Sequence, residues 1–265
     1  MPINPSSPVV VGVDGSEAAL VAVRWAVDEA LVRRVRLRIV HATSVTPSES
    51  DSPGRFDIEQ EYAEQSLRTA SAAAMENGKA VDVETAILWG EPDAELVDES
   101  SSAAMVCVGS TGIGRIARQV LGSTAATIAA KARCTAAVIR PTDRLPPGVA
   151  GSLAVAVDDA PDNARVLSAA LDEARLRNFH VFALSALGYD VLDQRVAELG
   201  ETYPGVHVIP VAATGGIARF VAQNRDLGIQ TAVIGEPDTE LVTDIVGPHG
   251  RSTMPHGQCS VLVVR

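Results

Sequence analysis

The sequence predicts an α/β protein built from two tandem, doubly wound, open parallel sheets of five strands each. Short apolar runs alternate with segments of helical periodicity, and this alternation restarts after a segment rich in proline and glycine near the middle of the chain. The composition agrees, because 46% of the 265 residues are hydrophobic while only 3% are aromatic. An Ala/Val/Leu-rich chain of this kind is typical of α/β proteins and not of aromatic-rich β-sandwiches.

The first element is expected to be a strand buried on both faces, because residues 9–13 (VVVGV) form a continuous apolar run. Asp14 or Ser16 can cap the helix that the periodicity predicts over 17–34. The other elements expected in the first half are a strand at 37–42, a loop at 44–57, a helix at 58–76, a strand at 81–88, a helix from 90 to about 100, a strand from 105, a helix at 123–132 and a strand at 136–140.

The second half of the chain repeats the first. Residues 153–186 align with residues 9–42 without a gap, and the last strand CTAAVIR (134–140) matches CSVLVVR (259–265). Edge-to-edge pairing of these last strands would give an internal pseudo-dimer, which leaves a homodimer open as a further assembly. The expected division is an N-terminal domain at 1–141, a linker at 142–151 and a C-terminal domain at 152–265.

Charge and composition narrow the class of function. A net charge of −11 and a pI near 4.9 argue against broad binding to nucleic acids or anionic membranes, both of which need a basic surface. No apolar run approaches the roughly 18 residues of a membrane span, and the first residues show no secretory leader. The three cysteines, each in or beside an apolar run, are expected to be reduced thiols. We therefore expect a cytoplasmic protein.

Glycines are concentrated after the strand that begins at residue 105. Gly109, Gly112 and Gly114 are followed by Gly122-Ser123-Thr124, which open a predicted helix. Exposed main-chain amides in a glycine turn, together with the positive end of a helix dipole, favour a phosphate group. No acidic residue lies between Gly109 and Arg140, although the whole chain is acidic. The stretch is therefore predicted to be a phosphate cradle.

At this point the sequence resembles the ATP-binding branch of the universal stress protein family. The spacing Gly109-x2-Gly112-x9-Gly122-Ser123 is similar to the glycine motif of that branch, as are the opening VVGVDGSEAA, the strand end His41-Ala42 and Cys134. The resemblance implies an adenine nucleotide alpha hydrolase-like, flavodoxin-like layout. It also implies that ATP, with any Mg²⁺ that the nucleotide carries, binds at the carboxyl ends of the strands, without a protein metal site.

The resemblance implies these site residues position by position. Asp14 matches the acid beside the adenosine, Gly12 lies close to the nucleotide, and Ala42 offers a main-chain group to the adenine edge. The phosphate and ribose loop comprises Gly109, Ser110, Thr111, Gly112, Ile113, Gly114 and Arg115, and the phosphate site continues in Gly122, Ser123 and Thr124.

The second copy departs from this pattern. Ala156, Asp238, Pro248 and His249 replace Gly12, Gly112, Ser123 and Thr124. A carboxylate within about 4 Å of a phosphate repels it by ~1 kcal/mol in water, and a proline removes a main-chain donor. We therefore expect a nucleotide site in the N-terminal domain only.

No catalytic residue is predicted. The chain has no P-loop, and the fingerprint G-x-G-x-x-A at 112–117 follows the fourth strand instead of the first. His41 is interpreted as a structural strand-end histidine, and His249 and His256 lack partners at metal-ligand spacing. The expected function is nucleotide-dependent regulation in a stress response, with an unknown protein partner. The alternatives are a scaffold without nucleotide and a weak ATPase.

Overall fold

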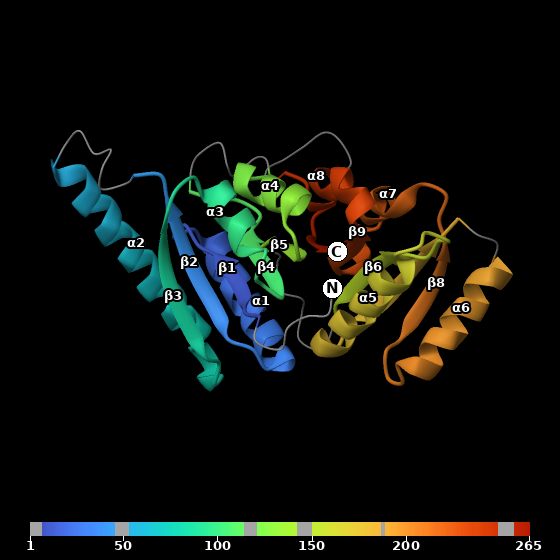
Figure 1. Cartoon of the computed structure of the whole chain (residues 1–265). Helices are drawn as coiled ribbons and strands as arrows, with labels where there is room; N and C mark the ends of the chain where they lie inside the picture. The colour runs from blue at the N-terminus through green and yellow to red at the C-terminus, as the bar shows by residue number, and fades with distance from the viewer. Residues whose placement is uncertain (1–6, 46–52, 114–120, 142–149, 187–188, 249–256) are drawn as a thin grey trace. The chain divides into compact units, whose positions relative to one another are not determined.

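A computed structural model describes residues 7–45, 53–113, 121–141, 150–186, 189–248 and 257–265. The chain divides into two compact units, residues 1–141 and 142–265, and each consists of a sheet with helices packed on it (Figure 1). All strand pairs described within the units are parallel. The predicted α/β class with parallel sheets is therefore confirmed.

The first unit has five strands in the spatial order β3-β2-β1-β4-β5. Strand β1 lies in the centre, between β2 and β4. The chain adds β2 and β3 on one side of β1 and then β4 and β5 on the other side, as in other doubly wound sheets. Its elements are β1 (Val9–Gly12), α1 (Glu17–Arg33), β2 (Leu37–Thr43), α2 (Pro53–Ala74), the 3-10 helix η1 (Glu76–Gly78), β3 (Val83–Trp89), α3 (Pro92–Glu99), β4 (Met105–Gly109), α4 (Ser123–Lys131) and β5 (Thr135–Ile139).

The helices of the first unit cover the sheet in two pairs. Helix α1 packs on α2 and on β4, whereas α3 packs on α4 and contacts β2. The central strands are almost fully buried, which explains why β1 and β4 are continuous apolar runs. Because the strands run in parallel, their carboxyl ends share one edge, where the turns after β1 and β4 meet.

Helix α2 begins earlier than the sequence predicted. Its first residue is Pro53, so residues 53–57, which were expected in a loop, are helical. Proline is tolerated in the first turn of a helix, where its missing N–H has no partner to lose. The first turn is also held by packing, because the ring of Phe56 lies 5.1 Å from the ring of Trp89 at the end of β3. Tertiary packing here overrides the polar composition of the segment.

The second unit has the corresponding strand order β10-β9-β6-β7-β8. Strand β8 forms one edge of this sheet and pairs only with β7 among the described residues. The elements are β6 (Ser152–Ala156), α5 (Asn163–Arg177), β7 (His180–Ser185), α6 (Tyr189–Thr202), β8 (Val208–Ala212), α7 (Gly216–Gln223), η2 (Arg225–Leu227), β9 (Ile229–Gly235), η3 (Glu236–Leu241), α8 (Val242–Val246) and β10 (Ser260–Val264).

Candidate functional site

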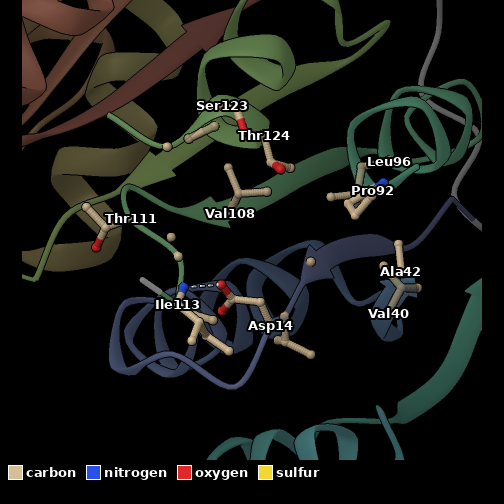
Figure 2. A pocket seen from close by; sticks show the side chains of 17 residues that line it. Asp14, Val40, Ala42, Pro92, Leu96, Val108, Thr111, Ile113, Ser123 and Thr124 are labelled. Carbon is tan, nitrogen blue, oxygen red and sulfur yellow. Dashed lines mark hydrogen bonds between the residues drawn. The ribbon is translucent and has the colours of Figure 1, made fainter. Parts of the chain in front are cut away.

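A pocket of about 320 Å³ opens at the carboxyl ends of β1, β2 and β4 in the first unit (Figure 2). This volume falls at the lower end of the range of about 300–1,000 Å³ that small-molecule sites occupy. The pocket is lined by Gly12, Val13, Asp14, Ala19, Val40, Ala42, Pro92, Leu96, Val108, Gly109, Thr111, Gly112, Ile113, Gly122, Ser123, Thr124 and Ala125.

One end of the pocket is apolar. Figure 2 shows Val40 and Ala42 from β2 together with Pro92 and Leu96 from α3 at that end. A Cβ atom on Gly12 would lie 2.7 Å from Leu96 Cδ1, so the glycine gives Leu96 the room to reach over the strand. An apolar slot between a strand end and a helix is suited to a flat heterocyclic ring.

The other end of the pocket is formed by the glycine loop, which is fastened to the turn after β1. Asp14 Oδ2 accepts a hydrogen bond from the Ile113 amide at 3.0 Å, the dashed line in Figure 2, while Asp14 Oδ1 accepts one from the Ser16 amide at 3.0 Å. Ser16 Oγ donates to the Thr111 carbonyl at 3.3 Å and also caps α1 by accepting from the Ala19 amide at 3.2 Å. The loop is therefore held from both sides.

Two glycines of this loop lie close to the protein's own atoms, Gly112 to a side chain and Gly109 to main chain. A Cβ atom on Gly112 would lie 2.6 Å from Asp14 Oδ2, which would break the contact that fastens the loop. A Cβ atom on Gly109 would lie 2.7 Å from the Ala18 carbonyl carbon, in the main chain of α1. Ser110 also serves the fold. It is fully buried, its amide donates to the Ile139 carbonyl at 2.8 Å, and it does not line the pocket.

The amino-terminal end of α4 opens into the pocket beside this loop. Ser123, Thr124 and Ala125, the first residues of α4, line the pocket, and no side chain caps the helix at Gly122. The Gly122 amide instead donates to the Ser110 carbonyl at 2.9 Å. The amides of a first helical turn and the positive end of the helix dipole form a favourable environment for an anion.

The structure brings together most of the residues that the sequence proposed. Ten of the predicted residues line the pocket, Ser110 does not, and Gly114 and Arg115 lie outside the described residues. The sequence reasoning missed the apolar lining residues Val13, Ala19, Val40, Pro92, Leu96, Val108 and Ala125. Only Pro92 carried a usable signal, as the proline that opens the helix after β3.

His41 lies at the carboxyl end of β2 but does not line the pocket. It is buried, its ring packs edge-on against Tyr62 with centres 5.8 Å apart, and its Nδ1 atom has no hydrogen-bond partner among the described residues. Burial lowers the pKa of His41, although the charge of Asp14 and a hydrogen bond with the Val13 main chain oppose the change. Burial therefore favours the neutral form of His41.

This environment predicts a pH-dependent stability for the first unit. The unfolded chain protonates His41 near pH 6.5 and the folded chain only at lower pH, so the free energy of unfolding should fall as the pH drops below about 6.5. Both tryptophans, Trp25 and Trp89, lie in the first unit, and their fluorescence during urea unfolding reports on that unit. Wild type should lose more stability between pH 7.5 and 5.5 than His41→Asn. If the wild type and His41→Asn lose the same free energy of unfolding, His41 is not the source of the pH dependence.

The corresponding edge of the second unit is acidic. Asp238 lies in η3, directly after β9. Burial raises the pKa of Asp238, and the negative charges of Asp158, Asp162 and Glu240 raise it further. Asp238 stands where the first unit has Gly112 of the glycine loop, and this carboxyl with the negative charges around it would oppose an anionic ligand.

The sheet order and the pocket define the first unit as a doubly wound α/β domain with a pocket at the carboxyl ends of the strands. Residues 6–140 match the model of the universal stress protein family. Universal stress protein Rv2624c from Mycobacterium tuberculosis is 41% identical over 264 residues, which cover 97% of this chain and 96% of that protein. The chain belongs to the universal stress protein family.

Two solved structures extend the comparison. A universal stress protein from Archaeoglobus fulgidus matches 98% of this chain and 98% of its own with a TM-score of 0.70, and at 19% identity it supports the fold alone. A universal stress protein in complex with cAMP is 29% identical over 48% of this chain and 90% of its own, but its TM-score of 0.36 supports no structural conclusion. Among the described residues, no helix combines the length and apolar character that crossing a bilayer requires.

Proposed function

We propose that the first unit binds an adenine nucleotide, ATP, in this pocket. The observation that carries the proposal is the meeting of the glycine loop and the uncapped start of α4 at one end of a pocket whose other end is apolar. The phosphates would lie against Thr111, Ser123 and Thr124, and the base would lie between β2 and α3. Ala42 would offer its main chain to the edge of the base.

Gly122 supports this placement independently. Its φ of −61° and ψ of 147° are open to any residue, and a Cβ atom there would make only ordinary contacts of 3.6 Å or more. The protein's own packing therefore does not require glycine at this position, in contrast to Gly109, which lies against the main chain of α1. A ligand that approaches the main chain closely explains why a side chain is absent.

The role proposed for the nucleotide is regulatory. Asp14 is the only titratable side chain among the described lining residues, and both of its carboxylate oxygens already accept main-chain amides. It is therefore poorly placed to act as a general base. A bound nucleotide would add contacts between the glycine loop, α4 and β1, and so would favour one conformation of this edge for a protein partner.

We further propose that the second unit does not bind ATP. Asp238 and its neighbouring acids occupy the edge where the phosphates would lie. The tandem chain would then carry one nucleotide. A scaffold without nucleotide and a weak ATPase are the competing functions, and nucleotide titration combined with a turnover assay separates all three.

The proposal predicts that Gly122→Ala selectively weakens ATP binding. Calorimetric titration of the wild type should give one ATP per chain with a Kd below 1 mM, about −4.1 kcal/mol or tighter. The added methyl group should raise the Kd by roughly tenfold, about 1.4 kcal/mol, while the free energy of unfolding without ligand, measured with urea, stays within about 0.5 kcal/mol of wild type. If Gly122→Ala binds ATP as tightly as the wild type does, the start of α4 does not form part of the phosphate site. A wild type that binds no ATP below 1 mM would favour the scaffold.

A further inference from the structure

Two histidines meet at the opposite edge of the second unit, away from its acidic edge. His180 begins β7, and His207 directly precedes β8, where the Val181 amide donates to the His207 carbonyl at 2.9 Å. The strands are paired in parallel from Val181 and Val208 onward, so the histidines are neighbours across the ladder. Their ring centres lie 5.2 Å apart with the planes at 84°. His207 is exposed and His180 is half-buried, so solvent reaches the pair.

We propose that His180 and His207 together bind one divalent transition-metal ion, with Zn²⁺ as the reference ion. Zinc–nitrogen bonds are about 2.0–2.1 Å long, and two imidazoles on one tetrahedral ion place their ring centres roughly 5 Å apart. The observed separation of 5.2 Å meets that requirement without movement of the strands. Neutral imidazole suits zinc, nickel and copper, and copper would bind most tightly of the three.

The first unit carries different residues at the positions that correspond to His180 and His207. By strand register, Arg36 and Asp82 lie at the positions of His180 and His207, and the Leu37 amide donates to the Asp82 carbonyl at 2.8 Å as the Val181 amide does to the His207 carbonyl. Arg36 donates to Glu84 at 2.9 Å. That hydrogen bond raises the pKa of Arg36, and the negative charges of Glu84 and Asp82 add to the effect.

The second unit has therefore replaced two residues of opposite charge, Arg36 and Asp82, by two bases. Opposite charges on neighbouring strands attract each other, an attraction that a pair of imidazoles lacks. A shared ion turns two adjacent bases into a stabilising cross-strand link. This difference between the two copies is an observation independent of the ring geometry, and it favours a ligand at the histidines.

The site would be open and of moderate affinity. No His, Cys, Asp or Glu of the described ranges joins the pair to make a group of three, so water would complete the coordination of the ion. Because β8 is an edge strand with largely half-buried residues, the ion would fasten it to β7. Binding should therefore slow hydrogen exchange of the amides of Val208, Ile209, Val211 and Ala212.

The test uses the full chain with other ligand candidates removed. In a background of His249→Gln, His256→Gln and Cys134→Ser, calorimetry in chelator-free buffer should show one Zn²⁺ per chain, together with slower exchange in β8. The matched control is His180→Arg with His207→Asp, which installs the pair of opposite charges that the first unit carries at this position. It should abolish both effects and leave the urea midpoint at or above that of the background.

Single exchanges distinguish one shared ion from two separate sites. If the histidines chelate one ion, His207→Gln alone should raise the Kd for Zn²⁺ by about tenfold or more, and His180→Gln should do the same. Three results would overturn the proposal: no Zn²⁺ binding to the background below 1 mM, equal binding in the double control, or single variants that lose nothing in affinity. Because none of these measurements involves nucleotide, the result is independent of the ATP site.

Discussion

Gly112→Asp should raise the Kd of the first unit for ATP by about 100-fold. The variant gives the glycine loop the residue that stands at the matching position of the second unit. A new carboxylate within about 4 Å of a phosphate costs about 1 kcal/mol in water and about 4 kcal/mol at an effective dielectric of 20. A hundredfold loss, about 2.7 kcal/mol, lies within that range. The side chain would also displace Asp14, whose Oδ2 lies 2.6 Å from the position of the new Cβ.

Two control variants separate charge from crowding. Gly112→Ala displaces Asp14 in the same way without adding a charge, so it should weaken ATP binding by less than the aspartate does. Asp238→Gly makes the reverse exchange in the second unit and should leave the ATP affinity of the first unit unchanged. Calorimetric titration of the three variants gives the comparison. If Gly112→Asp binds ATP as the wild type does, the glycine loop is not the phosphate site.

The parallel sheets were predictable because buried strands and amphipathic helices leave different periods in the sequence. The central strands β1 and β4 are apolar throughout, and the turns that end them contain Asp14 and Gly109. The start of α2 was not predictable in this way. The contact between Phe56 and Trp89 joins residues that are far apart in sequence, and local composition carries no trace of it.

The polar half of the site was also easier to predict than the apolar half. Closely spaced glycines and hydroxyls mark a loop that presents its main chain, and they form a recognisable pattern. Val40, Leu96 and Val108 have the same residue types as the core and lie on elements that any doubly wound domain would have. Only the packing of α3 over β2 shows that they face a pocket.

The glycine motif combines two physical requirements that the sequence does not distinguish. Gly109 and Gly112 are small because the protein's own atoms, in α1 and in Asp14, occupy the space that a side chain would need. Gly122 has that space free and lines the pocket. Loss of Gly109 should disturb the fold, loss of Gly112 should displace Asp14 from the glycine loop, and loss of Gly122 should disturb ligand binding alone.

Gly109→Ala should therefore destabilise the first unit by about 1–3 kcal/mol, the range expected for overpacking a close contact. Its Cβ would meet Ala18 and Ala19 main-chain atoms at 2.7–2.9 Å, and the main chain of α1 cannot move aside as a flexible side chain can. Urea unfolding followed by tryptophan fluorescence measures the change, with Gly122→Ala as the matched control. Equal midpoints for these two variants would show that α1 adjusts freely over β4. In that case the absence of a side chain at Gly109, as at Gly122, would be explained by the approach of the ligand and not by packing.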